Sequence, residues 1–170
     1  ASNGTVSITG TQTGDSITAN QEFDSRNAGS RTLSVTDVVV NDGNGGNNYT
    51  VVKNTATGTI NKATLTITAN TGQHKVYGDI DPTLGYGATG WKFSDGNGLL
   101  TGALGRAAGK NVGNYAINQG SLLATSNYDI SYTGADFAIT PRTLTATINA
   151  QNKVYDGNSS AAVIYGDNRV

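Results

Sequence analysis

The chain has 170 residues, a formal net charge of −1 and a charged fraction of 14%, against about 25% in a typical soluble domain. It contains no cysteine and no methionine, which excludes zinc ribbons, thiol nucleophiles and disulfide frameworks. Its charges are scattered singly, so we expect no nucleic-acid-binding face, and no apolar run approaches the ~20 residues that span a membrane.

Strand patterns recur along the chain as short runs of alternating polar and apolar residues. These runs lie at residues 5–9, 32–36, 64–68 and 143–148. A period of two places the apolar side chains on one face of a strand. Clusters of Gly, Asn and Asp separate the runs at 41–46, 95–98 and 156–158, and these residues accept the positive φ of tight hairpins. The sequence therefore predicts an all-β, mainly antiparallel fold.

Two stretches of the chain depart from this pattern. Residues 90–94 break the alternation, and a short helical turn is predicted there. Residues 99–106 are compatible with a helix, but Gly102 and Gly105 weaken that interpretation. Leu100, Gly102 and Leu104 fall on one face at strand spacing, which favours a strand.

An internal repeat organises the chain. Ile60 begins the pattern Ile-x-x-x-Thr-Leu-Thr, which leads to Lys75-Val76-Tyr77-Gly78-Asp79, and Ile139 begins a copy that leads to Lys153-Val154-Tyr155-Asp156-Gly157. Ile60 and Ile139 are 79 residues apart, as are Tyr49 and Tyr128, whereas Lys75 and Lys153 are 78 apart. The repeat predicts a complete module at 63–141, flanked by parts of a related module at 1–62 and 142–170.

The two flanking parts are complementary. Residues 1–62 lack the opening Lys-Val-Tyr strand, and residues 142–170 contain it. We therefore expect one period of a tandem array, in which residues 1–62 are completed by a copy of residues 142–170 from the preceding unit. The alternative is that two truncated neighbours flank the central module.

The central module resembles the MBG domain of the YGX type, which is found in large bacterial surface proteins. The resemblance rests on residues 75–84, 100–106, 111–117, 127–130 and 139–141, which follow the order of that family. The flanks are similar to the YDG domain at residues 153–160 and 26–29. The resemblance implies compact β modules, β-grasp-like and with at most a short helix. It also implies an elongated tandem repeat of a filamentous-haemagglutinin-like adhesin exported across a Gram-negative envelope.

Several residues of the repeated motifs are predicted to hold the modules together. They are Tyr77, Gly78, Asp79, Tyr115, Tyr128, Tyr155, Asp156 and Gly157. Buried tyrosine hydroxyls usually find a polar partner, so we expect these tyrosines to pack within a module and to reach backbone groups. Trp91 lies outside any alternation. It is predicted to contact a neighbouring module or, alternatively, to stack against a sugar.

The sequence patterns for catalysis and metal binding are weaker than those for strands and repeats. His74 is the only histidine, and no Gly-x-Ser-x-Gly motif accompanies it. Asp79 and Asp81 could form a carboxylate pair, but they belong to a turn before Pro82. Residues 42–45 and 95–98 resemble calcium loops but lack enough carboxylates. A Lys–Asn isopeptide bond through Lys62 or Lys110 stays open.

These observations predict a protein without catalytic activity, cofactor or bound metal. We expect a structural repeat unit, a stalk or spacer, of a secreted adhesin or extracellular filament on the surface of a Gram-negative bacterium. Its partners would be adjacent repeats of the same chain or neighbouring subunits, without membrane insertion. The alternative is a module that binds host or matrix glycan, for example within a biofilm.

Overall fold

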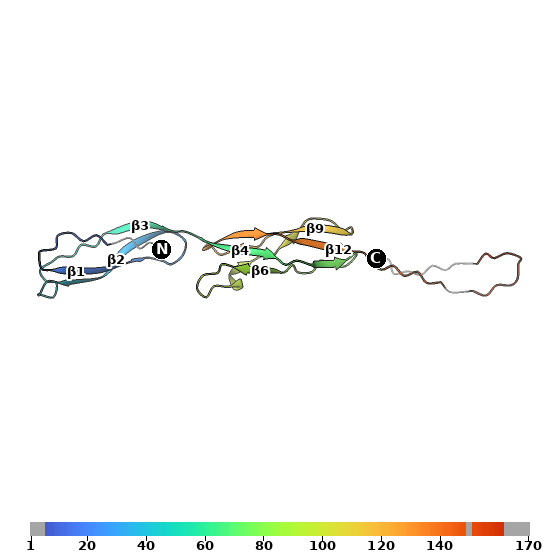
Figure 1. Cartoon of the computed structure of the whole chain (residues 1–170), viewed down its shortest axis with the longest axis horizontal. Coiled ribbons are helices and arrows are strands. Elements are labelled where there is room, and N and C mark those ends of the chain that lie inside the picture. The colour runs from blue at the N-terminus through green and yellow to red at the C-terminus, as the bar shows by residue number, and fades with distance from the viewer. Residues whose placement is uncertain (1–5, 149–150, 162–170) are drawn as a thin grey trace. The chain divides into compact units, whose positions relative to one another are not determined.

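The computed structural model describes residues 6–148 and 151–161, which form almost only β structure (Figure 1). Within those residues it contains twelve strands, one 3-10 helix and no α-helix. The predicted all-β, mainly antiparallel fold is confirmed. The strands are β1 (Ser16–Phe23), β2 (Gly29–Asn41), β3 (Thr55–Ile60), β4 (Ala63–Ala69), β5 (Gln73–Val76), β6 (Tyr86–Thr89), β7 (Leu100–Thr101), β8 (Gly105–Arg106), β9 (Gly113–Asn118), β10 (Leu123–Ala124), β11 (Tyr128–Thr133) and β12 (Asp136–Thr140).

The chain forms two compact units. The first holds the residues up to Leu65 together with Gly90–Leu99 and Ala124–Ile130. The second holds Thr66–Thr89, Leu100–Leu123 and the residues from Ser131 onward. Strands β4 and β11 each contribute residues to both units, so the predicted central module at 63–141 supplies part of the first unit and most of the second.

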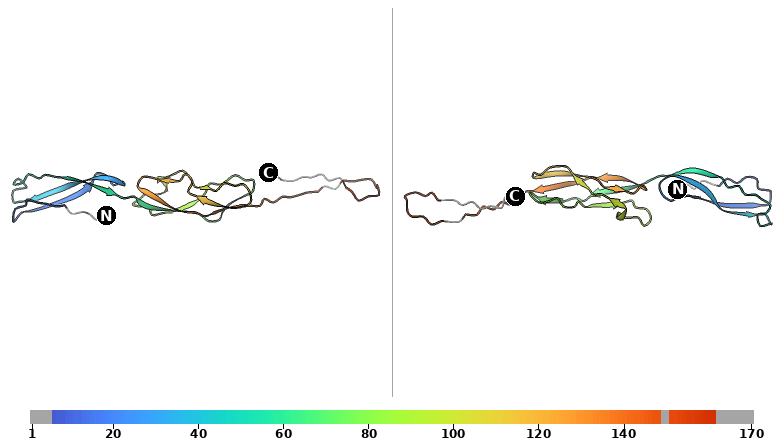
Figure 2. Two further views of the ribbon diagram at one scale, coloured as in Figure 1. Left: turned by 90° about the horizontal axis from the view of Figure 1, so that it is seen from above. Right: turned by 180° about the vertical axis from the view of Figure 1, so that it is seen from behind.

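Strands β1, β2 and β3 form an antiparallel sheet in the first unit and lie side by side in every view (Figures 1 and 2). Half-buried and exposed residues alternate along β1, as expected for a strand that is covered on one face. Gly58 lies against Phe23, whose ring would be 2.8 Å from a Cβ at that position. None of residues 6–62 is buried, so this sheet has only part of a core.

The buried core lies in residues 63–141. The order of the strands in the three sheets is β11-β4-β6, β10-β7 and β5-β12-β9-β8. Alternate residues of β4 are buried, as the period of two predicts. The buried apolar side chains are Leu65, Ile67, Ala69, Leu104, Ile117, Leu122, Tyr128, Phe137 and Ile139.

The segment from residue 90 to 106 differs in part from the prediction. The helical turn expected at 90–94 is absent, and a 3-10 helix (Asn97–Leu99) follows instead. The positive φ of Gly90 (104°) and Phe93 (54°) is incompatible with a right-handed helix. The strand expected at 99–106 is confirmed only in part, as the short strands β7 (Leu100–Thr101) and β8 (Gly105–Arg106). Residues 102–104 form no strand, and the chain turns there at Gly102.

Two further predicted strands are wrong in this structure. Residues 6–9 and residues 143–148 carry the alternating pattern but form no strand, although Thr147 takes part in an isolated β-bridge. Residue 5 lies outside the described residues. A strand requires a neighbour that accepts and donates its backbone hydrogen bonds. An alternating pattern alone therefore does not determine whether a segment becomes a strand.

Candidate functional site

The candidate site is the parallel pairing of β5 with β12, which we call the parallel ladder. Residues 137–140 of β12 lie opposite residues 73–76 of β5 in an unbroken register. The backbone N–H of Tyr77 extends the ladder by donating to the carbonyl of Thr140 at 2.9 Å. The hydroxyl of Thr140 donates to the carbonyl of Lys75 at 3.2 Å. The ladder thus joins β5, the second strand of the module, to β12, its last strand.

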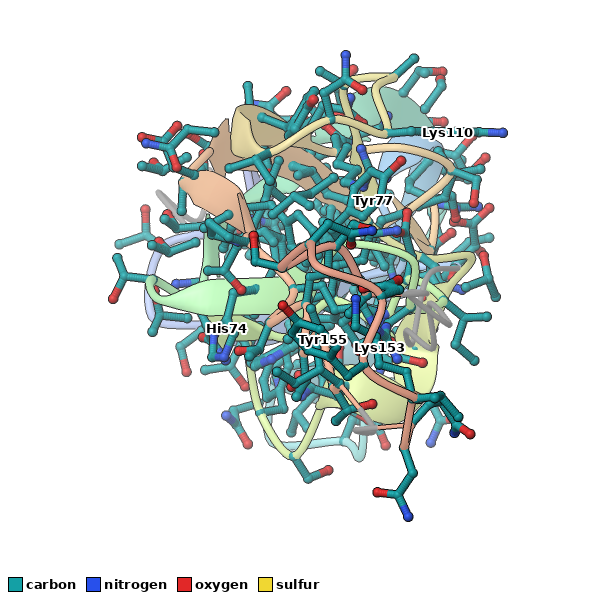
Figure 3. The ribbon with its side chains drawn as sticks, turned by 90° about the vertical axis from the view of Figure 1, so that its right-hand side faces the viewer. His74, Tyr77, Lys110, Lys153 and Tyr155 are labelled. Atoms are coloured by element: carbon teal, nitrogen blue, oxygen red, sulfur yellow. The ribbon has the colours of Figure 1, made fainter. Side chains whose placement is uncertain are left out.

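The Tyr-Gly-Asp motif forms the turn that directly follows β5. Gly78 has a φ of 90°, a left-handed conformation that favours glycine. The guanidinium of Arg142 donates to the carbonyl of Tyr77 at 3.1 Å and to Asp79 Oδ1 at 2.9 Å. Since Arg142 comes just after β12, it links the exit of the module to this turn. Figure 3 shows Tyr77 beside the end of β5.

Asp81 lies at the centre of an ion cluster beside the ladder. Its Oδ1 is 2.6 Å from the ammonium of Lys75, and its Oδ2 is 2.8 Å from Nε of Arg106. The guanidinium of Arg106 also lies 5.3 Å from the ring centroid of Phe137, a cation–π distance. The hydrogen bonds from Arg106 and then Lys75 lower the pKa of Asp81 from 3.8 to about 2. A carboxylate held ionised in this way suits an ion pair and not a general acid.

This cluster predicts a stability that depends on acid pH. Because Asp81 has a lower pKa in the folded chain than the ordinary 3.8, its contribution is present above pH 4 and is lost as the pH falls through about 2. We expect the thermal midpoint to fall over that range and to fall less steeply in Asp81→Asn. Asp136→Asn, at an exposed position of β12, is the matched control and should keep the wild-type slope. Calorimetry at a series of pH values measures both.

The hydroxyl of Tyr128 connects two segments of the first unit, Ala124–Ile130 and Gly90–Leu99. The hydroxyl donates to Asp95 Oδ2 at 2.7 Å and accepts from the backbone N–H of Lys92 at 2.9 Å. Tyr128 is 5% exposed, and its ring meets that of Trp91 edge to face at a centroid distance of 5.0 Å. Burial, followed by the bond to Asp95, raises the pKa of the Tyr128 phenol.

Removing this hydroxyl is expected to destabilise the chain without disturbing the packing of the ring. Tyr128→Phe leaves the Lys92 N–H and the Asp95 carboxylate without this partner, and the thermal midpoint should fall by about 5 °C. Tyr155→Phe is the matched control because Tyr155 is 92% exposed. An equal fall of the thermal midpoint in the two variants would contradict a stabilising role of the Tyr128 hydroxyl.

The remaining predicted motif residues lie in different surroundings. Tyr115 donates from its hydroxyl to the carbonyl of Asn111 at 2.7 Å. Trp91 contacts Tyr128 within the first unit. In the second copy of the motif, Lys153 donates to Asp156 Oδ1 at 2.9 Å and lowers the pKa of that carboxyl. Gly157 has a φ of 76°.

The junction at residues 60–63 was not singled out by the sequence. A cavity of about 130 Å³ lies there within the first unit, lined in part by Arg26, Ile60 and Asn127. Asn127 Oδ1 accepts from the backbone N–H of Ala28 at 2.8 Å, and its carbonyl accepts from the N–H of Ala63 at 2.9 Å. The repeated motif at 26–29 includes Ala28. The sequence could not predict its hydrogen bond to Asn127, because the two residues are 99 positions apart.

The other candidates of the sequence have local roles. His74 is exposed on β5, and its Nδ1 lies 2.9 Å from the carbonyl of Gly72 (Figure 3). Lys62 forms an ion pair of 2.9 Å with Asp129, and its side chain is 48% exposed. Lys110 is exposed with its ammonium directed away from the protein (Figure 3). Neither lysine has the burial that an isopeptide bond requires. Asp42 accepts backbone hydrogen bonds from within its own turn, which lower its pKa.

Comparison with known families identifies the central module. Residues 65–138 match the family model of the MBG domain (YGX type). The matched segment lies inside the predicted module at 63–141 and confirms the resemblance of that module. It covers less than half of the chain, and the YDG resemblance of the flanks stays a prediction. No curated protein and no solved structure matches the chain.

The match also indicates the class of protein to which the module belongs. An MBG domain indicates a repeat module of an extracellular surface protein. In the part of the chain that the structure describes, no helix has the length and apolar character needed to cross a membrane.

Proposed function

We propose that this chain is a tension-resisting stalk unit of a secreted adhesin or extracellular filament, built from tandem β modules on a Gram-negative cell surface. Two findings support the proposal. The first is the MBG match, which indicates a repeat module of a surface protein. The second is the parallel ladder, which carries the proposal because the modules of a stalk must stay folded when the chain is pulled.

The direction of the strands determines whether tension loads the hydrogen bonds of the ladder together or one at a time. Strands β4 and β5 follow one another in the same direction, and β12 runs parallel to β5 (Figure 1). The chain enters the module at the start of β4 and leaves at the end of β12. Tension between these two points slides β5 and β12 past each other, so the bonds of the ladder bear it together. Hydrogen bonds that share a force resist more than bonds that are opened one at a time.

Side chains reinforce the end of the ladder where the force arrives. Arg142 is the first charged residue after β12, and it binds the turn after β5 through the Tyr77 carbonyl and Asp79. Lys75 and Arg106 hold Asp81 on the same turn. Both cationic side chains are largely covered, with 13% and 12% exposed, and water competes less for such pairs than for surface pairs.

Single-molecule force spectroscopy in two pulling directions tests the proposal. The chain has no cysteine of its own, so attachment points can be introduced freely. Pulling through terminal tags loads the ladder in shear. Pulling through Thr71→Cys and Asp136→Cys loads the same ladder from one end, where its bonds open in sequence. We expect the second geometry to unfold the module at about half the force or less, since each bond is weak alone.

A matched pair of charge variants sharpens the result. Arg142→Ala should lower the unfolding force in the terminal geometry, and Lys110→Ala should leave it unchanged because Lys110 is exposed away from the ladder. Equal forces in both pulling directions would refute a role of the ladder under tension. Saturable glycan binding that is lost in Trp91→Ala would instead favour the alternative function.

A further inference from the structure

The small cavity of the first unit is lined by more positive than negative charge. Arg26 and Lys92 line it together with Asp95, whose carboxylate accepts a hydrogen bond from the hydroxyl of Tyr128. In the part of the chain that the structure describes, neither Arg26 nor Lys92 forms an ion pair. Guanidinium and ammonium groups donate hydrogen bonds and accept none. The lining therefore offers an excess of donors and of positive charge.

Two neighbouring residues, Asn127 and Tyr128, fix the two chain segments that carry these cations. The side-chain oxygen of Asn127 accepts from the backbone N–H of Ala28 at 2.8 Å, two residues after Arg26. The hydroxyl of Tyr128 accepts from the backbone N–H of Lys92 at 2.9 Å. Both cationic side chains therefore extend from backbone that is held by hydrogen bonds, which is the support that a binding site requires.

The turn from Lys92 to Asp95 has a counterpart within the first unit. There, Tyr49 donates from its hydroxyl to Asp15 Oδ2 at 2.5 Å and accepts from the backbone N–H of Gln12 at 3.0 Å. The N–H of Asp15 donates to the carbonyl of Gln12 at 3.2 Å, and the equivalent bond from Asp95 to Lys92 measures 3.1 Å. The two turns thus share their backbone hydrogen bond and their tyrosine contacts.

The two turns differ in the side chains that they present. Gln12 and Thr13 of one turn stand where the other has Lys92 and Phe93. Since glutamine and threonine allow the same hydrogen bonds, the turn requires neither a cation nor an aromatic ring. Lys92 and Phe93 are therefore better explained by a contact outside the turn.

Phe93 combines an unfavourable backbone conformation with an exposed ring. Its φ of 54° is left-handed, which is rare for a large side chain, and the residue is 89% exposed. In the counterpart turn the positive φ falls on a glycine, Gly14, at 100°. Backbone strain of this kind is typical of ligand-binding positions. The ring of Phe93 also lies beside the cationic lining, with the guanidinium of Arg26 at 5.4 Å from its centroid.

The size and the lining of the cavity indicate the chemistry of its ligand. Its volume of about 130 Å³ is several times the ~30 Å³ of one water molecule, so it has room for a carboxylate or sulfate group. Guanidinium and ammonium groups are the usual protein partners of such anions. The exposed ring of Phe93 adds a flat apolar surface, against which the C–H groups of a sugar can pack. Trp91, the sugar contact expected from the sequence, packs against Tyr128.

We propose that this cavity binds the carboxylate or sulfate group of an acidic polysaccharide. The guanidinium of Arg26 and the ammonium of Lys92 bind the anion, and the ring of Phe93 packs against the sugar that carries it. An MBG module indicates an extracellular surface protein, and acidic polysaccharides are common in capsules and extracellular matrices. The site gives the chain an adhesive contact of its own, which goes beyond the mechanical function proposed above.

Titration of the isotope-labelled full chain, followed by NMR, tests this proposal. Oligogalacturonate carries carboxylate groups, a sulfated dextran oligosaccharide carries sulfate groups, and the unmodified dextran oligosaccharide is the neutral control. The backbone amides of Lys92, Phe93 and Asn127 should shift with at least one anionic probe and not with dextran. A response to only one anionic probe supports the site and identifies its anion. The affinity should fall as salt is added, because salt screens exposed charges.

Matched variants assign the binding to the cavity. Arg26→Gln and Lys92→Gln should each weaken binding about tenfold, the effect of losing one charge-assisted hydrogen bond. Both positions are exposed, so the variants should keep the wild-type thermal midpoint. Phe93→Ala should also weaken binding, because it removes the surface for the sugar. Lys110→Gln is the control, and it should change the affinity by less than about twofold because Lys110 lies in the second unit.

Three results would overturn the proposal. The first is the absence of amide shifts with both anionic probes, and the second is an equal response to dextran. The third is an oligoglutamate that binds as tightly as the better oligosaccharide, because the site would then accept anions without a sugar. None of these results affects the force measurements, since the parallel ladder lies in the second unit.

Discussion

Phe137→Ala is expected to lower the free energy of unfolding by about 3–5 kcal/mol, because the variant leaves a cavity in the core. Phe137 lies on β12 with no exposed surface. Its ring also faces the guanidinium of Arg106 at 5.3 Å. The loss would remove a large part of the ~5–15 kcal/mol that keeps a typical domain folded. It would also weaken the strand on which the parallel ladder depends.

Phe93→Ala provides a control with the same change of side chain. Phe93 is 89% exposed, and its ring contacts Arg26 at 5.4 Å. That variant should lose at most the ~0.5–1 kcal/mol of an exposed cation–π contact. Urea denaturation followed by circular dichroism measures both free energies. Similar losses in the two variants would mean that the core does not lie where the structure places it.

The sequence predicted the features of this fold that are encoded within one strand or turn. The alternation at residues 64–68 identified β4, since burial on one face follows from a period of two. The internal repeat located the module that the family model matches at 65–138. The glycine of the Tyr-Gly-Asp motif was recognised as part of a turn, and Gly78 has the positive φ that such a turn requires.

Features that depend on distant partners were not predictable in the same way. The pairing of β12 with β5 joins residues 64 positions apart, such as Phe137 and Gln73. No local pattern specifies which strands become neighbours. Arg142 lay beyond the quoted motifs, and its role follows only from its contact with Asp79. Residues 6–9 and 143–148 carry the alternating pattern but form no strand, because a strand also depends on neighbours that the local pattern does not specify.

The turn between β7 and β8 leads to the second prediction with a large effect. Gly102 has a φ of 80°, and a Cβ there would lie 2.1 Å from the carbonyl oxygen of Ser121. The neighbouring backbone cannot move easily, because the N–H of Ser121 donates to the carbonyl of Ala103 at 3.0 Å. Gly102→Ala therefore combines a left-handed conformation with a backbone overlap. We expect it to cost about 2–4 kcal/mol of unfolding free energy.

Gly96→Ala is the matched control in a second turn of the same module. A Cβ at Gly96 would have no neighbour within 4 Å, and its φ is not positive. Alanine at such a site restricts the unfolded chain, so the variant should be neutral or stabilised by up to about 1 kcal/mol. Opposite signs of the two changes in urea denaturation would show that Gly102 is required for its backbone conformation. If both variants were neutral, the turn would have to differ from the one described, and the placement of β7 against β10 would have to be revised.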